Sequence, residues 1–336
     1  MDVATRVLRI GVIGVGRIGR MHADLLARRI PGATVTRVHD AHSESARDVA
    51  ETLGVVAVSD VEELLTASDV DAVAICTSTD THADLIMRAA KAGKAIFCEK
   101  PVDLDLQRAR TCADAVRAAG VTCLIGFQRR YDPTFASVKA RIARGDIGRP
   151  EMLIVTSRDP GAPPVDYIKR SGGIYKDMLI HDFDVFRWIM EDEAATVYAT
   201  GSCLVDPAIE AAGDVDATAV TIRTRDGRLA QINTIRRAAY GYDQRFEVLG
   251  SKGMLQAGNH RPTEALLWST DAVAADKPEY FFLERYRAAY AAEMAHFFDV
   301  VAGRAAAVTS IDDGVKALAL AEAATTSWRE KRIVEL

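Results

Sequence analysis

The sequence has few cysteines, no excess of one charge and no long apolar segment, and each absence excludes a class of protein. Its 336 residues include five cysteines, an odd number without a close pair, so neither a disulfide framework nor a structural zinc site is expected. Charges interrupt every apolar run before it reaches the ~20 residues of a membrane helix. The segment Met1–Arg6 has no apolar run of the kind found in signal peptides, so we expect a cytoplasmic protein.

The charge balance gives no sign of a nucleic-acid partner. Lys and Arg number 42 against 47 Asp and Glu, for a net charge of −5, so the chain would gain nothing from releasing counterions on a polyanion. Hydrophobic residues make up 49 % and charged residues 26 %, which excludes a disordered, collagen-like or coiled-coil chain. The length predicts about two domains.

The first third of the chain alternates short apolar runs with amphipathic stretches. The apolar runs are Val7–Ile13, Thr34–Val38, Val55–Val58, Asp71–Ile75, Ala95–Cys98 and Cys123–Ile125. The amphipathic stretches include Ile18–Arg28, Glu44–Leu53, Ala83–Ala92 and Leu106–Ala119. Strands that alternate with helices of about 10–15 residues form βαβ units with helices on both faces of a parallel sheet. This part predicts a Rossmann-type α/β domain.

The pattern changes after Asp132 to that of an α+β domain. We expect helices at Phe135–Arg144, Lys176–Met190, Tyr286–Val300 and Asp313–Trp328, and a Pro/Gly-rich loop over Asp159–Gly173. Expected strands are Met152–Ser157, Thr196–Cys203, Ala217–Arg223, Leu229–Arg236, Arg245–Leu249 and Ala265–Trp268. Asp226-Gly227 is a strong hairpin signal, so the sheet should be mainly antiparallel. We expect one domain over residues 1–126 and a second over residues 127–336.

A glycine-rich loop follows the first expected strand and opens the first helix. In Gly14-x-Gly16-x-x-Gly19, the first glycine allows a tight turn, the second allows a pyrophosphate to approach, and the third allows the helix to pack closely on the strand. The loop also contains Arg17 and Ile18, and the helix N-terminus offers free N–H groups to phosphates. Taken alone, such a motif is a glycine turn without a ligand about as often as it is a dinucleotide-binding loop.

Asp40 makes the dinucleotide interpretation the stronger one. It ends the second strand, about 20 residues after the last glycine, where an acid accepts hydrogen bonds from the adenosine ribose. A carboxylate there repels a 2′-phosphate, so the sequence predicts NAD rather than NADP. The alternative is a solvated acid at a strand end, which the βαβ context makes the lesser possibility.

Lys100 follows the fifth strand in Glu99-Lys100-Pro101. Ligands of open α/β sheets bind beyond the carboxyl ends of the strands, so Lys100 should face the cofactor. A surface lysine in a loop is the competing interpretation, and position alone leaves the two about even.

Asp177 and His181 are four residues apart in an expected helix, so they should share one face. A carboxylate beside an imidazole orients it and keeps it basic near neutral pH, as the oxidation of an alcohol requires. An Asp/His pair on a helix surface without function is the commoner alternative. A zinc site is not expected, since the motif supplies one His and no cysteine nearby.

Taken together, these motifs resemble the glucose–fructose oxidoreductase/inositol dehydrogenase superfamily, and within it the inositol 2-dehydrogenase branch. The resemblance rests on Glu-Lys-Pro after a Rossmann-type half and on Gly-Gly-x-x-x-Asp-x-x-x-His-Asp at Gly172–Asp182. It extends over nearly the whole chain through the segments Gly126–Asp132, Ser157–Pro160, Tyr240–Arg245, Gly250–Met254 and Tyr280–Tyr286.

The resemblance implies a catalytic set of Lys100, Asp177 and His181. His181 would be the base, Asp177 would orient it or relay to Lys100, and Lys100 would stabilise the developing alkoxide. The implied substrate contacts are these three residues with Arg129, Asp159 and Tyr242. The implied cofactor contacts add Thr77, Ser78, Glu99 and Lys100 to the glycine loop and Asp40. His82 could equally be a cap or packing residue.

The implied activity is NAD-dependent oxidation of a cyclitol, first of all myo-inositol to 2-keto-myo-inositol (scyllo-inosose). Open alternatives are scyllo-inositol, another cyclitol or an aldose as substrate, a glycosidase that retains NAD, and a non-catalytic NAD sensor. The resemblance also implies an open sheet that pairs across subunits, so a homo-oligomer, a dimer or a tetramer, is expected.

Overall fold

The computed structural model describes residues 7–336, which form two compact units. The first unit is the chain up to Gln128 together with Ala289–Leu318, and the second is Arg129–Ala288 together with Ala319–Leu336. The segment Met1–Arg6, on which the expectation about a signal peptide rests, lies outside the described residues. No helix within residues 7–336 is both long and apolar enough to cross a membrane.

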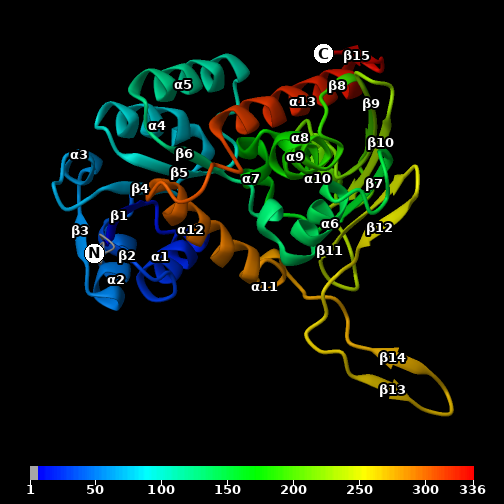
Figure 1. Cartoon of the computed structure of the whole chain (residues 1–336), viewed down its shortest axis with the longest axis horizontal. Helices are drawn as coiled ribbons and strands as arrows, with labels where there is room; N and C mark the ends of the chain where they lie inside the picture. Colours follow the sequence, from blue (N-terminus) through cyan, green and yellow to red (C-terminus); the bar gives the residue numbers. More distant parts are fainter. Residues whose placement is uncertain (1–6) are drawn as a thin grey trace. The chain divides into compact units, whose positions relative to one another are not determined.

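The first unit is built on a six-stranded parallel sheet in the order β3-β2-β1-β4-β5-β6 (Figure 1). Its strands are β1 (Leu8–Ile13), β2 (Ala33–His39), β3 (Val56–Val58), β4 (Ala72–Ile75), β5 (Ala95–Glu99) and β6 (Cys123–Gly126). Its first helices are α1 (Arg17–Arg28), α2 (Ser43–Leu53), α3 (Val61–Leu65), α4 (His82–Lys91) and α5 (Leu106–Ala119). The expected Rossmann-type sheet is confirmed, with the strand order reversing between β1 and β4, where such sheets bind ligands.

A helix from late in the sequence completes the core of the first unit. The expected first domain, residues 1–126, did not include this helix. In α12 (Arg287–Val301), Phe297 packs against Phe97 of β5 with ring centroids 6.0 Å apart. Phe298 of the same helix lies against Gly32, where a Cβ atom would come within 2.5 Å of its ring. The chain therefore returns to bury apolar surface of the parallel sheet, and the unit is discontinuous in sequence.

The second unit is built on a seven-stranded sheet in the order β12-β11-β7-β10-β9-β8-β15. Its strands are β7 (Pro150–Arg158), β8 (Ala194–Ser202), β9 (Ala217–Thr224), β10 (Leu229–Ile235), β11 (Asp243–Gly250), β12 (Gly253–Ala257) and β15 (Val334–Glu335). Only β7 and β10 pair in parallel, so the expected mainly antiparallel sheet is confirmed. The remaining pair, β13 (Leu266–Trp268) and β14 (Val273–Ala275), forms a separate hairpin.

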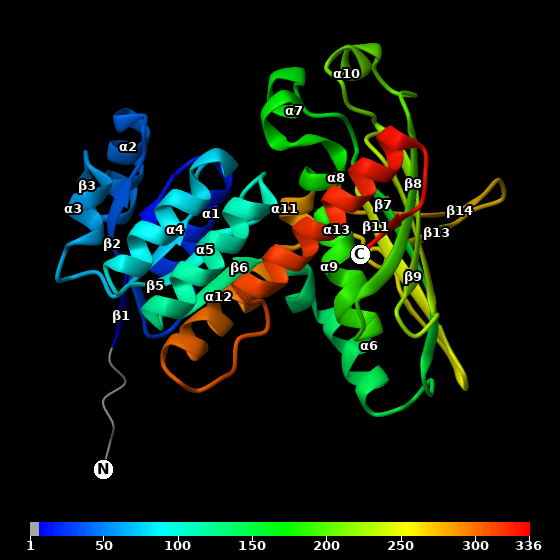
Figure 2. The same ribbon diagram turned by 90° about the horizontal axis from the view of Figure 1, so that it is seen from above.

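Helices cover one face of this second sheet, as Figure 2 shows for α6 (Pro133–Ala143), α9 (Leu179–Met190) and the end of α13 (Ile311–Glu330). Alternate strand residues such as Val155 and Ile232 are buried beneath Phe183 and Phe186 of α9. Side chains therefore alternate along each strand, apolar ones toward the helices and more polar ones on the other face. This period of two explains why the sequence pattern predicted strands here.

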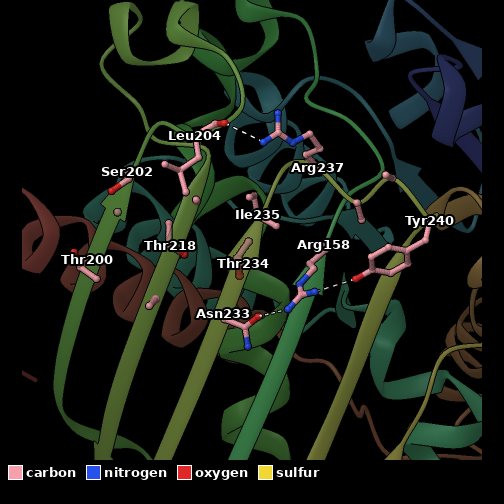
Figure 3. A pocket seen from close by; sticks show the side chains of 15 residues that line it. Arg158, Thr200, Ser202, Leu204, Thr218, Asn233, Thr234, Ile235, Arg237 and Tyr240 are labelled. Atoms are coloured by element: carbon pink, nitrogen blue, oxygen red, sulfur yellow. Dashed lines mark hydrogen bonds between the residues drawn. The ribbon is translucent and has the colours of Figure 1, made fainter.

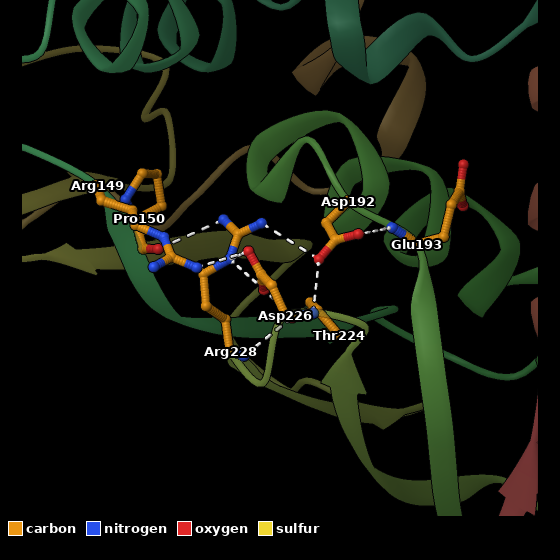
Figure 4. A network of polar contacts seen from close by, with 7 residues as sticks. All are labelled: Arg149, Pro150, Asp192, Glu193, Thr224, Asp226 and Arg228. Carbon is orange, nitrogen blue, oxygen red and sulfur yellow. Dashed lines mark hydrogen bonds and ion pairs between the residues drawn. The ribbon is translucent and has the colours of Figure 1, made fainter.

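The predicted Asp226-Gly227 turn joins β9 to β10 through a network of polar contacts (Figure 4). The Asp226 carboxylate accepts hydrogen bonds from the Thr224 hydroxyl at 2.6 Å and from Arg228 Nε at 2.8 Å, and pairs with Arg149. These donors, Arg228 first, hold the pKa of Asp226 well below its usual value. Gly227 adopts a φ of 92°, which favours glycine at this position.

The expected loop at residues 159–173 is wrong over its second half, which forms helix α7 (Val165–Ser171). Prolines are confined to the start of the segment, where Pro164 precedes the first turn, and Ile168 is buried below the helix. Other short elements that the sequence did not predict are α3, α10 (Pro207–Ala211), α11 (Phe282–Arg285), β12 and β14. Each has five residues or fewer, too few for a clear period.

Candidate active site

The glycine loop has the geometry that dinucleotide binding requires. Gly14 has a φ of 85°, and a Cβ atom there would lie 2.8 Å from the backbone carbon of Cys76. A Cβ atom on Gly19 would lie 1.9 Å from the carbonyl oxygen of Gly14, so α1 can approach β1 this closely only with glycine. Nothing lies within 4 Å of the position of a Cβ on Gly16, which precedes α1. The loop thus leaves open space at a helix N-terminus, where phosphates bind.

Asp40 directly follows β2 and holds the glycine loop in place. Its Oδ2 accepts a hydrogen bond from the backbone N–H of Val15 at 2.8 Å, and its Oδ1 accepts one from that of His42 at 2.8 Å. Each carboxylate oxygen has a second lone pair, so Asp40 can still accept hydrogen bonds from ribose hydroxyls. Asp40 therefore has a structural role that sequence spacing did not indicate.

The remaining cofactor candidates follow β4 and β5, which are neighbours at the same edge of the parallel sheet. Thr77 lies against Gly14, whose Cβ position would be 2.8 Å from the Thr77 methyl carbon. Glu99, the last residue of β5, contacts the buried ring of His22, with 2.7 Å between Oε1 and Nε2. Ser78 follows Thr77 and Lys100 follows Glu99. The structure therefore brings these candidates to the edge that carries the glycine loop.

His82 connects the two loops that carry these residues. It is 1 % exposed, and its Nδ1 lies 2.7 Å from the carbonyl oxygen of Pro101, while its Nε2 lies 3.1 Å from that of Thr77. Burial lowers the pKa of His82 against the smaller effects of these two carbonyl groups, which raise it. We interpret His82 as a packing residue that joins the backbone at Pro101, next to Lys100, to the backbone at Thr77.

Stability should fall as the pH decreases below about 6.5, in part because of His82. The unfolded chain takes up a proton on this residue near that pH, while the folded protein resists protonation until lower pH, so acid favours unfolding. In His82→Gln the free energy of unfolding should fall less steeply with decreasing pH, by as much as about 1.4 kcal/mol per pH unit. Near neutral pH this variant should be less stable than the wild type. Urea unfolding at about pH 7.5, 6.5 and 5.5 measures the slope. His42→Gln, at an exposed position, is the control, and an identical slope in wild type and His82→Gln would contradict the prediction.

In the second unit, Arg129 lies at the centre of a buried polar cluster. Its Nη1 forms an ion pair with Asp182 Oδ1, and its Nη2 lies 3.4 Å from the hydroxyl of Tyr242. Gln244 also donates to Asp182 Oδ1, at 3.1 Å. All four residues are at most 4 % exposed, so the cluster is shielded from water and fixed by its own bonds.

Burial and neighbouring groups together set the charge states in this cluster. Burial acts to lower the pKa of Arg129, but Asp182, together with Tyr242 and Tyr286, outweighs it and raises the pKa, so Arg129 stays a cation. Burial raises the pKa of Tyr242, and the charge of Asp159 adds to the rise, so Tyr242 keeps its proton. The cluster therefore holds one fixed cation, paired with Asp182, beside one neutral hydroxyl.

The prediction that Asp177 and His181 share one continuous helix is wrong. Asp177 is the last residue of α8 (Gly173–Asp177), Met178 interrupts the helix with φ −99° and ψ −55°, and His181 lies in α9. At the break, Asp177 Oδ1 accepts a hydrogen bond from Tyr167 at 2.9 Å, and Oδ2 pairs with Arg236 at 3.2 Å. Both partners lie outside α8 and α9, so the spacing of four could not reveal these contacts.

Asp159 lies just beyond β7, partly exposed, and its backbone N–H donates to Ile235 at 3.1 Å. Its charge raises the pKa of both Tyr242 and Tyr167. The second unit therefore joins the expected substrate residues Arg129 and Tyr242 in one cluster and also contains Asp159 and Asp177. Lys100 belongs to the first unit.

The site has the features that a bound dinucleotide requires and lacks those of a metal site within residues 7–336. The open space at Gly16, the tight packing at Gly14 and Gly19, and the acid at the end of β2 fit an NAD molecule. Among residues 7–336, no group of three His, Cys, Asp or Glu side chains is arranged to hold a metal ion. All five cysteines are free thiols.

Sequence reasoning missed several residues that hold the site together. Asp182 could have been found, since it follows His181 directly in the motif. The others are distant in sequence from the groups they contact, and no local signal marks them. They are His22, Tyr167, Arg236 and Gln244.

Comparison with known proteins agrees with this architecture. The chain is 46 % identical over 329 residues to an inositol 2-dehydrogenase of Rhizobium meliloti, covering 98 % of this chain and 99 % of the relative. It is 38 % identical to an NAD⁺-dependent scyllo-inositol 2-dehydrogenase of Bacillus subtilis, covering 98 % and 96 %. A myo-inositol dehydrogenase from Lactobacillus casei, crystallised with NAD(H) and myo-inositol, superimposes with a TM-score of 0.89 at 29 % identity, covering 98 % and 97 %.

Family models match both parts of the chain. Residues 8–127 match the NAD-binding Rossmann fold of an oxidoreductase family, and residues 139–336 match the C-terminal alpha/beta domain of the same family. The chain therefore belongs to the Gfo/Idh/MocA oxidoreductase family, as its glycine loop, its Glu-Lys-Pro segment and its Asp/His motif had indicated.

Proposed function

We propose that this protein oxidises a secondary alcohol of a cyclitol with NAD, and that its preferred substrate is myo-inositol, converted to 2-keto-myo-inositol. The observation that carries the proposal is the buried polar cluster around Arg129, in which a cation and a neutral hydroxyl, both able to bond to hydroxyl groups, lie side by side. The relatives named inositol 2-dehydrogenase support it, as does the crystallised relative with NAD(H) and myo-inositol.

In the proposed mechanism, His181 takes the proton of the reacting hydroxyl. Asp177 orients His181, and Lys100 stabilises the negative charge that develops on the oxygen as its proton leaves. NAD, when bound, accepts the hydride from the same carbon. The balance is one alcohol and one NAD⁺ giving one ketone, one NADH and one proton.

Arg129, Asp159 and Tyr242 are proposed to bind the hydroxyl groups that do not react. The glycine loop with Arg17 and Ile18, together with Asp40, Thr77, Ser78, Glu99 and Lys100, is proposed to hold NAD. Because Arg129 and Tyr242 are already fixed by Asp182 and by each other, they lose little freedom when substrate binds.

Asp40→Ala should lose most of the preference for NAD. Removing the carboxylate removes both the acceptor for the ribose hydroxyls and the repulsion of a 2′-phosphate, so kcat/KM for NAD should fall by about tenfold or more. The ratio of kcat/KM for NADP to that for NAD should rise at least as much. Steady-state kinetics with each cofactor measures both quantities. Asp24→Asn, an exposed carboxylate on α1, is the control, and an unchanged ratio in Asp40→Ala would contradict the role of Asp40.

The test of the whole proposal is a panel of cyclitols and aldoses, assayed with NAD and ranked by kcat/KM. We expect myo-inositol to rank first, with NADH formed in amounts equal to the ketone. A preference for scyllo-inositol, which the Bacillus subtilis relative makes a specific alternative, would change the substrate but not the reaction. A preference for an aldose over every inositol would overturn the proposed substrate class. Release of an aglycone without net NADH would identify an NAD-retaining glycosidase.

We also propose that the protein acts in the cytoplasm as a homo-oligomer, either a dimer or a tetramer. The face of the second sheet away from its helices carries exposed apolar side chains, among them Tyr198, Leu249 and Met254, at 43–48 % exposure. A groove of about 680 Å³ lies on this face, lined in part by Arg158, Thr200 and Asn233 (Figure 3). We propose that a second copy of the chain packs against this face of the sheet. Light scattering that shows a monomer at micromolar concentration would contradict this assembly.

A further inference from the structure

We infer that Arg236 and Tyr167 are positioning residues that hold Asp177 as an ionised carboxylate in a single orientation. This inference rests on the proposed function, in which Asp177 orients the base. Neither residue belongs to the motifs that identified the site: Arg236 follows β10, and Tyr167 lies in α7, the helix that the sequence did not predict.

The geometry places Tyr167 and Arg236 on different oxygens of the Asp177 carboxylate. The Tyr167 hydroxyl donates to Oδ1 at 2.9 Å, and Arg236 Nη2 donates to Oδ2 at 3.2 Å. Two bonds to different oxygens fix the rotation of the carboxylate as well as its position. A carboxylate so fixed can present the same face to a neighbouring imidazole in every turnover.

Burial makes the contact with Arg236 strong. The Arg236 side chain is 1 % exposed, and its Nε is buried without a hydrogen-bond partner among the residues that the structure describes. A buried guanidinium needs a nearby anion, since it cannot release its proton. Asp177, whose side chain is 13 % exposed, supplies that anion.

The other charged groups near Asp177 act against its ionisation. Asp214 accepts two hydrogen bonds from the backbone N–H of Ile174 in α8, at 3.2 and 3.0 Å. Burial raises the pKa of Asp214, and the charge of Asp177 is among the further causes, so the two acids repel each other. Asp159 and Asp177 each raise the pKa of Tyr167 by their charge. Lys176, the neighbour of Asp177 in α8, is paired with Glu322 at 3.1 Å. Arg236 is therefore the cation that offsets this excess of acids.

Removal of either partner should raise the pKa of Asp177, because each stabilises the charged form. If the ionised form orients His181, the acidic limb of the pH profile of kcat/KM should move to higher pH by about one unit in Tyr167→Phe and by at least as much in Arg236→Gln. Arg236→Lys, which keeps the charge, should recover part of the shift. The controls are Tyr280→Phe, at a 71 % exposed position, and Arg144→Gln, at a position whose side chain is 61 % exposed.

A second measurement does not depend on activity. Carbon-13 NMR of protein labelled at aspartate carboxyls, with the Asp177 signal assigned by its loss in Asp177→Asn, gives the titration midpoint of this group directly. We expect the midpoint to rise in Tyr167→Phe and Arg236→Gln and to stay unchanged in both controls. Tyr167→Phe is the decisive variant, because it removes one hydroxyl from a half-exposed residue and should fold normally.

The outcomes separate the two proposals. An unchanged midpoint in both variants would overturn the inference, whatever the substrate. A raised midpoint in a protein that oxidises no cyclitol would support the roles of Arg236 and Tyr167 in holding Asp177 and would refute the proposed function. A raised midpoint with an unmoved pH profile would overturn the link between the Asp177 charge and the reaction. Coincident shifts in both measurements support the inference.

Discussion

His181→Ala should lower kcat for cyclitol oxidation by about 100- to 10,000-fold. Without the imidazole, the hydroxyl proton has no positioned acceptor, and hydride transfer from a neutral alcohol is unfavourable. Lys100→Met should cost about 100- to 1,000-fold in kcat, because it removes a positive charge that stabilises the developing alkoxide. Rates of NADH formation at saturating myo-inositol and NAD measure both effects.

Two controls make this result specific to the chemistry. NAD affinity, measured by fluorescence titration, should be nearly unchanged in His181→Ala, since His181 is not among the residues proposed to hold NAD. His42→Ala changes an exposed histidine and should leave kcat unaffected. A kcat within about threefold of wild type in both His181→Ala and Lys100→Met would refute the proposed mechanism.

Asp132→Ala should lower the free energy of unfolding by about 3–5 kcal/mol. Asp132 Oδ2 pairs with Arg285 Nη1 at 2.5 Å, and both side chains are at most 1 % exposed, so its removal leaves a buried cation without its anion. The same carboxylate caps α6, where Oδ1 accepts hydrogen bonds from the N–H groups of Thr134 and Phe135. Urea unfolding at neutral pH measures the loss.

A double substitution distinguishes the two contributions of Asp132. In Asp132→Ala with Arg285→Met, no buried charge remains, so part of the lost stability should return, leaving mainly the cost of the missing cap, about 1 kcal/mol. Asp146→Ala removes an exposed carboxylate that pairs with Arg141 and should cost less than about 1 kcal/mol. If the double variant is no more stable than Asp132→Ala, the buried cation is not the cause.

Local patterns predicted the regular elements of the fold well, and the physical reason is their period. Helix α5 coincides with the expected Leu106–Ala119, since Asp105 caps its start and Gly120, with φ 65°, ends it. The Asp226-Gly227 turn was likewise visible, because the residue types that form such turns are few. Some short elements, such as β12 and α10, were missed because a run of five residues has no clear period and these two lack the continuous apolar run that marked β3 and β4.

The failures have a different physical origin. At the interruption near Met178, Asp177 contacts Tyr167 and Arg236, which lie 10 and 59 residues away along the chain. The return of α12 to the first sheet follows from the burial of Phe297 against Phe97. Neither contact has a local signature, because both depend on which distant surfaces meet after folding.

The sequence by itself determined that this protein combines a dinucleotide-binding sheet with a second α+β part. It also supplied the candidates Lys100, Asp177 and His181, because glycine spacing, an acid at a strand end and the Glu-Lys-Pro and Asp/His motifs are local properties of the chain. Only the tertiary structure decided how these groups are held. It showed that Asp40 fastens the glycine loop, and that Asp182 and Arg236, buried and charged, fix the partners Arg129 and Asp177. A buried charge is stable only beside an opposite charge, and its partner can lie far away in sequence. The spacing of residues along the chain therefore does not reveal which residues form such pairs.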